Sequence, residues 1–377
     1  MNNFIFQNPT KLIFGKGQIA NLSKFIPSQT KIMLTYGGGS IFKNGIYDQV
    51  KSALKGYDII EFSGIEPNPE YDTLMRAVEI ARDNGVDMLL AVGGGSVIDG
   101  TKFIAAALKY DGDPWEFLLD ESKVSGAIPL ASVLTLPATG SEMNRAAVVS
   151  RREIDEKRAF HSDYCFPVFS ILDPEACYSL PKKQITNGIV DTYIHTVEQY
   201  LTVVNQNMVM DRWAESLLIT LVELAPRLMS DEPSYDDMAN FVLTATMALN
   251  GFISMGAVQD WATHLIGHEL TALHELDHGQ TLAVVYPGVL SVMRESKREK
   301  LLQYGKRVWG VDSVDEAIEK TEAFFRSVGM KTKLSEYEIG EETISKIVER
   351  MRSRGWNLGE GQLVTPEKVD EILHAVK

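Results

Sequence analysis

Cysteine is nearly absent from this chain, which contains only Cys165 and Cys177 among its 377 residues. Two cysteines are too few for a disulfide scaffold, and their spacing matches no zinc knuckle. We therefore expect both to be small buried apolar side chains, and we expect the protein to work in a reducing cytoplasm.

Long apolar runs and an excess of positive charge are also missing. No run approaches the length that spans a membrane, and the first residues do not combine a basic segment with an apolar core, so we predict neither membrane insertion nor export. The net charge of −14 argues against a nucleic-acid partner, because such partners require a cationic surface. A small molecule is the partner that this composition favours.

Strands alternate with helices over the first half of a chain that is long enough for two domains. Buried-strand patterns occupy residues 31–36, 58–62, 87–92 and 128–136, and a last strand is expected at 168–174. This alternation implies right-handed βαβ crossovers and a mostly parallel sheet. Two short apolar runs between residues 3 and 15 additionally predict an opening strand pair, which is a candidate edge for a dimer.

Three of these strands end in turns rich in glycine or hydroxyl groups, at residues 37–40, 93–96 and 137–142. The first two read Gly-Gly-Gly-Ser, which is neither the G-x-G-x-x-G pattern nor a Walker A loop. Each of them, taken alone, fits a simple tight turn about as well as a ligand site. Glycine allows close approach of a ligand, and a helix N-terminus offers N–H groups to an anion, so the three turns together favour a pyrophosphate site.

The pattern changes from residue 182 to long amphipathic helices, and this half of the chain is expected to be nearly all helical. Thr365 and Pro366 are typical of the cap and first position of a closing helix. Because no repeats or long linkers separate the halves, they are expected to pack tightly across a cleft.

Four of the seven histidines fall between residues 261 and 282, amid apolar residues. Upstream, Asp191 and His195 lie four residues apart, which places them on one face of a helix. Burial of several imidazoles without a shared partner would be costly, so a metal is favoured over ordinary buried or solvent-facing histidines. A carboxylate with imidazoles suits Zn²⁺ or Fe²⁺. Spacing alone does not choose among His264, His268, His274 and His278.

A competing motif lies within this stretch, because residues 274–278 match the zinc-protease pattern H-E-x-x-H. That chemistry requires both histidines on one stable helix, with the glutamate as general base. Here Gly279 follows at once and the flanking residues are polar, so we interpret the match as accidental.

Six segments together resemble the iron-containing, or group III, alcohol dehydrogenases, in the branch of butanol dehydrogenases and NADPH-dependent aldehyde reductases. They are YGGGS at 36–40, GIEPNP at 64–69, AVGGGSVIDGTKFIAAA at 91–107, LTLPATGSE at 134–142, VDTYIHTVEQY at 190–200 and QDWATHLIGHELTALHELDHGQTLA at 259–283. The resemblance implies an α/β dinucleotide-binding domain with a Rossmann-like, mostly parallel sheet (residues 1–181). It also implies an all-α metal-binding domain (residues 182–377), in a dehydroquinate synthase-like architecture with the metal between the domains.

The resemblance also implies roles for single residues. The metal ligands would be Asp191, His195, His264 and His278, while His268 would lie near the nicotinamide and relay a proton. His274 would not bind the metal. The residues that would contact the dinucleotide are Gly37, Gly38, Gly39, Ser40, Lys43, Asn68, Gly94, Gly95, Ser96, Asp99, Thr135, Thr139, Ser141, Val148 and Lys157.

The first glycine turn predicts the cofactor. NAD-using members of this family tend to carry an acidic residue after the first strand, where it bonds to the ribose 2′-hydroxyl. This sequence has three glycines there, followed by Ser40 and a nearby Lys43. The departure favours NADP(H) over NAD(H).

The expected reaction is hydride transfer between NADP(H) and a small aliphatic aldehyde or primary alcohol, with Fe²⁺ or Zn²⁺ polarising the substrate oxygen. Apolar residues around the histidines, such as Leu265 and Ile266, suit an uncharged substrate. The alternatives are a dehydroquinate synthase-like lyase or a polyol dehydrogenase on the same fold, a zinc protease, and a non-catalytic nucleotide-binding protein. A cytoplasmic homodimer is expected.

Overall fold

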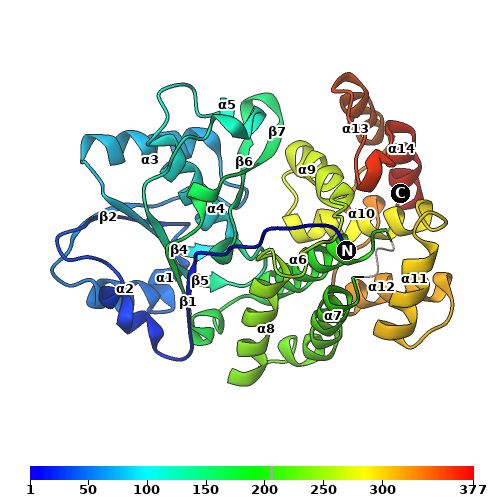
Figure 1. Ribbon diagram of the computed structural model, residues 1–377, viewed down its shortest axis with the longest axis horizontal. Coiled ribbons are helices and arrows are strands. Elements are labelled where there is room, and N and C mark those ends of the chain that lie inside the picture. Colours follow the sequence, from blue (N-terminus) through cyan, green and yellow to red (C-terminus); the bar gives the residue numbers. More distant parts are fainter. Residues whose placement is uncertain (204–206) are drawn as a thin grey trace. The chain divides into compact units, whose positions relative to one another are not determined.

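The computed structural model describes residues 1–203 and 207–377, which form two compact units (Figure 1). The sheet unit comprises Gln7–Gln184 and Glu232–Asn250, and the helical unit comprises Met1–Phe6, Ile185–Asp231 and Gly251–Lys377. This division differs at residues 1–6, 182–184 and 232–250 from the division into residues 1–181 and 182–377, which stays a prediction. In the described part of the chain, no helix is long and apolar enough to cross a membrane.

The sheet unit is built on six parallel strands. Their spatial order is β1 (Lys11–Phe14), β8 (Phe169–Leu172), β5 (Leu130–Leu136), β4 (Met88–Gly94), β2 (Lys31–Tyr36) and β3 (Asp58–Phe62). The central strands are buried along nearly their whole length, as expected for a parallel sheet covered on both faces. The predicted fold class, a mostly parallel α/β part followed by a helical part, is confirmed.

Two features of this unit differ from the sequence prediction. The predicted opening strand pair is wrong: only β1 forms, and residues 1–10 have no regular secondary structure. Asn8 instead caps a turn, because its side-chain oxygen accepts the backbone N–H of Thr10. An antiparallel hairpin of β6 (Ala146–Arg151) and β7 (Glu156–His161) was not predicted.

The helices of the sheet unit are α1 (Ser40–Lys43), α2 (Ile46–Ala53), α3 (Tyr71–Asp83), α4 (Gly95–Ala107), α5 (Glu116–Leu119) and α8 (Tyr235–Ala248). Helix α4 is buried almost throughout, including its polar residues Asp99, Thr101 and Lys102. Helix α8 comes late in the sequence. It joins this unit through Thr246, whose hydroxyl donates a hydrogen bond to Glu142 at 2.5 Å.

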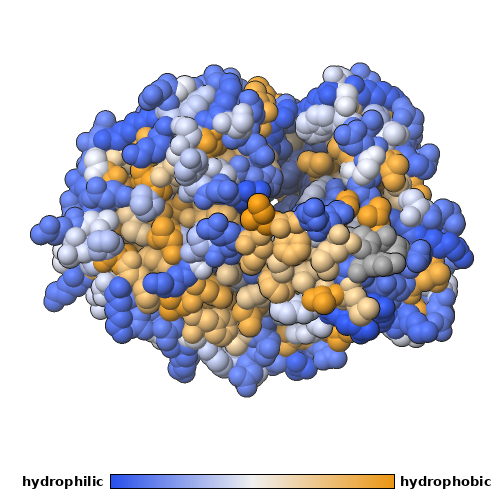
Figure 2. Space-filling view, viewed as in Figure 1, coloured by the Kyte–Doolittle hydropathy of each residue, from blue (hydrophilic) through white to orange (hydrophobic). Residues whose placement is uncertain are grey.

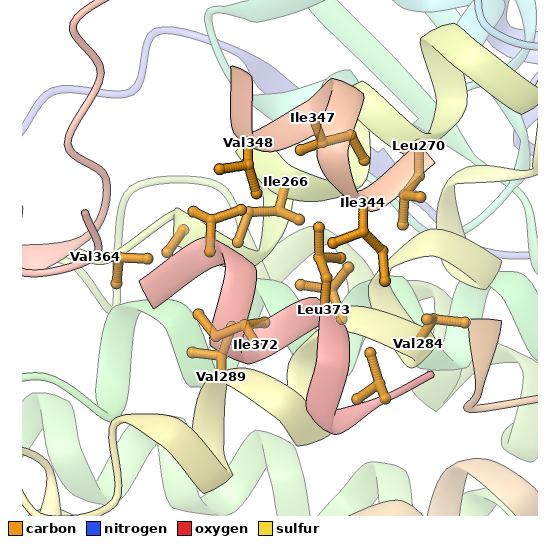
Figure 3. Packing of buried hydrophobic residues seen from close by; sticks show 14 of the residues in the cluster. Ile266, Leu270, Val284, Val289, Ile344, Ile347, Val348, Val364, Ile372 and Leu373 are labelled. Atoms are coloured by element: carbon orange, nitrogen blue, oxygen red, sulfur yellow. The ribbon is translucent and has the colours of Figure 1, made fainter. Parts of the chain in front are cut away.

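The helical unit contains an apolar core among α9, α10, α13 and α14, and its α-helices include four others. Together these helices are α6 (Lys182–Tyr200), α7 (Met208–Leu228), α9 (Ala262–His274), α10 (His278–Val292), α11 (Arg298–Tyr304), α12 (Val314–Ser327), α13 (Glu341–Ser353) and α14 (Pro366–Ala375). Figure 3 shows side chains of α9, α10, α13 and α14 meeting in this core, among them Ile266, Val289 and Ile347. Thr365 caps α14 by accepting the backbone N–H of Lys368, as predicted.

Candidate metal centre and cofactor-binding residues

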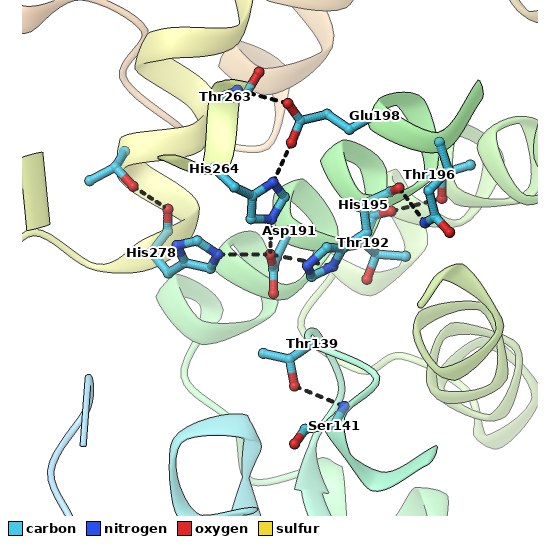
Figure 4. Close-up of polar contacts among 12 residues, drawn as sticks. Thr139, Ser141, Asp191, Thr192, His195, Thr196, Glu198, Thr263, His264 and His278 are labelled. Atoms are coloured by element: carbon cyan, nitrogen blue, oxygen red, sulfur yellow. Dashed lines mark hydrogen bonds and ion pairs between the residues drawn. The ribbon is translucent and has the colours of Figure 1, made fainter. Parts of the chain in front are cut away.

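Asp191, His195, His264 and His278 come together within the helical unit (Figure 4). One ligand atom from each of them lies within 4.8 Å of the others. The Nδ1 atom of His195 and the Nε2 atom of His278 are each 3.5 Å from Asp191 Oδ1, and His264 Nε2 is 4.0 Å from the same oxygen. The structure therefore groups the four residues that the resemblance names as ligands.

Local structure explains why these side chains converge. Asp191 and His195 lie one turn apart on the buried helix α6. Helix α9 follows Trp261, which has a left-handed φ of 68°, and Asp260 Oδ1 caps α9 by accepting the N–H of Ala262. His278 is the first residue of α10, whose start is fixed by a capping box between Asp277 and Gln280.

The donor set fits a divalent transition metal. Three imidazole nitrogens and one carboxylate oxygen are ligands that Zn²⁺ and Fe²⁺ accept. Asp191, His195 and His264 are buried, and His278 is partly exposed. Four polar groups this close together and mostly buried would be costly without a shared partner. A cation bound by all four would compensate for the loss of their contacts with water.

Glu198 is a residue of this site that the sequence reasoning missed. It lies one turn beyond His195 on α6, and it is 2% exposed. One carboxylate oxygen accepts the N–H of Thr263 at 2.7 Å, and the other contacts Nδ1 of His264. Burial, reinforced by the nearby Asp260 carboxylate, raises the pKa of Glu198 to about 8. A charged residue inside an apolar helical stretch was the available signal in the sequence.

The other two histidines of the stretch lie outside the group of four. His268 is buried one turn after His264, and its ring centroid is 5.6 Å from that of His278. His274 ends α9, where its Nε2 forms a hydrogen bond with the Thr343 hydroxyl at 2.8 Å. Burial lowers the pKa of His274.

The H-E-x-x-H match does not form a protease helix. Helix α9 ends at His274, Glu275 adopts a left-handed φ of 55°, and α10 begins at His278. The two histidines of the motif therefore belong to different helices. The interpretation of this match as accidental agrees with the backbone.

The second glycine turn forms the start of α4 in the sheet unit. Gly94 is the N-cap residue, so no side chain caps the helix, and no acidic residue occupies the first turn. A Cβ atom on Gly95 would come within 2.4 Å of the Thr139 side chain, so only glycine fits this packing. The turns at 93–96 and 137–142 are therefore in contact, and the N-terminus of α4 is free of a competing anion from its own first turn.

Asp99 and Lys157 organise the other predicted contacts in this unit. Asp99 accepts hydrogen bonds from the Ser141 hydroxyl at 2.6 Å and from the Val148 N–H at 3.0 Å, and burial raises its pKa. Lys157 donates to Asn68 Oδ1 at 2.9 Å. Asn68 has a left-handed φ of 56°. Its backbone N–H donates a hydrogen bond to the Ser96 hydroxyl, with 3.3 Å between the nitrogen and the oxygen.

The remaining predicted contacts lie at the ends of β2 and β5. Gly37, Gly38 and Gly39 connect β2 to α1, which runs from Ser40 to Lys43. Thr135 is buried near the end of β5. The structure thus places all predicted dinucleotide contacts in the sheet unit, while their contact with a dinucleotide stays a prediction.

The parallel α/β sheet, and the helical unit that carries a carboxylate and three imidazoles, fit a metal-dependent enzyme of the family that the sequence resembles. Residues 9–174 match the family model for iron-containing alcohol dehydrogenase, and residues 185–376 match that for the C-terminal part of the same family. The chain belongs to the iron-containing alcohol dehydrogenase family.

Individual relatives narrow the branch. The chain is 49% identical to the NADPH-dependent aldehyde reductase YqhD of Escherichia coli and 40% identical to the probable NADH-dependent butanol dehydrogenase 1 of Bacillus subtilis, each over the full length of both chains. The crystal structure of NADH-dependent butanol dehydrogenase A from Thermotoga maritima superposes with a TM-score of 0.95 at 35% identity. It covers 100% of this chain and 99% of that one. These similarities place the chain in the butanol dehydrogenase and aldehyde reductase branch, and they do not favour the lyase or polyol dehydrogenase alternatives.

Proposed function

We propose that this protein is a metal-dependent, NADP(H)-linked aldehyde reductase and alcohol dehydrogenase that acts on small aliphatic aldehydes and primary alcohols. The observation that carries the proposal is the mostly buried group of Asp191, His195, His264 and His278 in a chain of the iron-containing alcohol dehydrogenase family. The names of the relatives support the substrate class, because they are an aldehyde reductase and butanol dehydrogenases.

The residues of the helical unit would hold Fe²⁺ or Zn²⁺ and exclude water around it. When bound, such an ion is a Lewis acid that stabilises negative charge on a substrate oxygen. Asp191 and His195 present their donors from one face of α6, while α9 and α10 supply His264 and His278. His268, buried one turn after His264, is the residue that we propose as the proton relay.

The residues of the sheet unit would bind the dinucleotide. The start of α4, at Gly94, Gly95 and Ser96, offers backbone N–H groups to a pyrophosphate. The turn after β2 contains no acidic residue that would repel a 2′-phosphate. Glu61, on the neighbouring strand β3, accepts hydrogen bonds from Tyr36 and Lys51, so its charge is compensated. These features support NADP(H) over NAD(H).

The deciding experiment compares the oxidation of NADPH and NADH by purified, metal-replete protein with butanal. Faster turnover with NADPH is expected. Preference for NADH would retain the dehydrogenase and contradict the argument from the first glycine turn. Absence of oxidation with either cofactor would contradict the proposed function.

We propose a homodimer as the assembly and the cytoplasm as the location. Phe4, Ile5 and Phe6 are exposed, and Ile5 is 99% accessible. Figure 2 shows that apolar side chains are exposed among the hydrophilic ones on the surface drawn there. Cys165 and Cys177 are both buried free thiols, which suits a reducing compartment. Light scattering at a mass of two chains would support the dimer, and a mass of one chain would contradict it.

A further inference from the structure

We infer that Glu198 is the positioning residue for His264, and that Glu198 is itself held by a buried polar network containing one bound water molecule. The inference rests on the proposed metal site and adds to it a residue that would not touch the ion. Every residue of the argument belongs to the helical unit.

The two carboxylate oxygens of Glu198 have separate roles. One accepts the backbone N–H of Thr263 at 2.7 Å, and the other contacts Nδ1 of His264. Thr263 lies in the first turn of α9, where backbone N–H groups have no partner within the helix. Glu198 therefore fixes the start of α9 and the imidazole that α9 carries with a single side chain.

The contact at Nδ1 determines which ring nitrogen of His264 can bind a metal. A neutral imidazole has one nitrogen that carries a proton and one that has a free lone pair. When Glu198 is ionised, the imidazole proton lies on Nδ1 and is directed at the carboxylate, and the lone pair lies on Nε2. That atom is the one that lies 4.0 Å from Asp191 Oδ1. A carboxylate that accepts the second N–H of a histidine is the usual means of orienting a metal ligand.

Behind Glu198 lies a cluster of buried charges centred on Lys297. Its ammonium donates to Asp260 at 2.8 Å, to Glu360 at 2.6 Å and to the carbonyl of Leu201 at 2.8 Å. Asp260 in turn caps α9 and donates its own N–H to the carbonyl of Glu198 at 2.8 Å. Lys297 thus supplies the positive charge that compensates this group of buried carboxylates.

Glu198 and Tyr286 both line a small cavity. Its volume is about 10 Å³, measured as the space open to the centre of a water molecule, and Glu198, Asp260, Lys297 and Tyr286 line it together with apolar residues. The Tyr286 hydroxyl is buried and has no hydrogen-bond partner among the residues that the structure describes. A cavity of this size with several polar groups accommodates one water molecule. That water would bond to the Tyr286 hydroxyl and brace the carboxylates around it.

The first test measures metal affinity rather than turnover. Glu198→Gln keeps the shape of the side chain and its acceptor for Thr263, but directs an amide N–H₂ at His264 Nδ1. The dissociation constant for Zn²⁺, measured by chelator competition, is expected to increase by about 10- to 100-fold. Glu215→Gln is the control, because Glu215 is also buried in this unit and accepts from Tyr200, away from the four ligands. Its Zn²⁺ affinity is expected to match wild type.

A second measurement does not depend on the folding of a variant. Imidazole ¹⁵N NMR of the Zn²⁺-loaded wild-type protein, with His264 assigned from its Ala variant, is expected to show the proton on Nδ1. A proton on Nε2, or unchanged Zn²⁺ affinity in Glu198→Gln, would overturn the role of Glu198. If His264→Ala binds Zn²⁺ as tightly as wild type, the proposed metal site itself fails, which distinguishes the two failures.

The water is tested by a high-resolution crystal structure. Density for one water between Tyr286 and Glu198 is expected in the wild-type protein, and its loss is expected in Tyr286→Phe. An empty cavity in the wild-type protein would overturn this part of the inference.

Discussion

His264 uses both nitrogens of its ring, because Nδ1 contacts Glu198 while Nε2 faces Asp191. Removal of this ring takes away a proposed ligand and the partner of a buried carboxylate. We expect His264→Ala to lose bound metal and turnover, while dinucleotide affinity stays near wild type because its proposed contacts lie in the sheet unit. Metal content, butanal reduction and NADPH fluorescence titration measure the three effects.

The control for this variant is His274→Ala. His274 ends the same helix but contacts Thr343 and lies outside the group of four. It is expected to retain metal and turnover. Normal turnover in His264→Ala would contradict the assigned site.

Lys102 provides a prediction about pH. Its ammonium is fully buried and donates to Asn144 Oδ1 at 2.9 Å and to the carbonyl of Ala146 at 2.7 Å. Burial lowers the pKa of Lys102 to about 8 from 10.5, against the opposing effect of Asp99. Between these values the unfolded chain still holds a proton that the folded protein has released, so the folded state gains stability as the pH rises.

The gain is at most about 3.5 kcal/mol, at roughly 1.4 kcal/mol for each pH unit. Urea unfolding of wild type and of Lys102→Met over this pH range measures the gain. Subtracting the unfolding free energy of the variant from that of wild type cancels the contribution of groups that titrate alike in both proteins. The midpoint of wild type is expected to rise relative to the variant from pH 8 to 10.5. A constant difference over that range would contradict the lowered pKa.

The sequence predicted some residues of the site and missed others. The spacing of Asp191 and His195 predicted a shared helix face, and four nearby histidines suggested a metal, but spacing did not choose among them. The resemblance named the set that the structure brings together. The role of Glu198 was not predicted, because it depends on α9 lying beside α6. No local sequence pattern encodes that tertiary contact.

At the scale of elements, α6 and α10 approach closely at Gly279. A Cβ atom there would lie 2.8 Å from both the Cα and the carbonyl oxygen of Asn187, so backbone would have to move. We expect Gly279→Ala to destabilise the protein by about 1–3 kcal/mol and to weaken metal binding, because His278 precedes it. Thermal unfolding and Zn²⁺ affinity measure the two effects.

Gly340→Ala is the matched control in the same unit. Nothing lies within 4 Å of the Cβ that it would add, and the backbone is not left-handed. It is expected to change Zn²⁺ affinity in no measurable way. Equal effects of the two substitutions would contradict the importance of the α6–α10 contact.

The elements themselves were largely predictable. Strands β2 and β3 occupy the residues predicted for them, because buried parallel strands are short apolar runs bounded by turns. The hairpin of β6 and β7 was missed, since its residues are mixed in character and its turn at Asp155 carries no glycine. The opening strand pair was predicted from apolar runs, but strand formation also requires a partner. Only β1 finds one, in β8.

At the scale of the whole molecule, the proposed metal links α6 to the consecutive helices α9 and α10, which come much later in the sequence. A ligand that binds only the folded protein stabilises it in proportion to the logarithm of its concentration over its dissociation constant. Chelation is therefore expected to lower the thermal midpoint of wild type. The midpoint of His264→Ala, which is expected to lack the ion, should be the same with and without chelator. Calorimetry with and without chelator measures this, and a wild type insensitive to chelation would contradict the site.

Helix α8 belongs to the sheet unit but follows two helices of the helical unit in sequence, which has a consequence for biosynthesis. The sheet unit takes its first strand from the start of the chain and α8 from residues 235–248, beyond α6 and α7. A ribosome must therefore make two helices of the helical unit before the last piece of the sheet unit emerges. The sheet unit is therefore expected to mature only after Asn250 has been synthesised, when α6 and α7 are already present but α9 to α14 are not, with slow closure of the long-range pairing of β1 and β8.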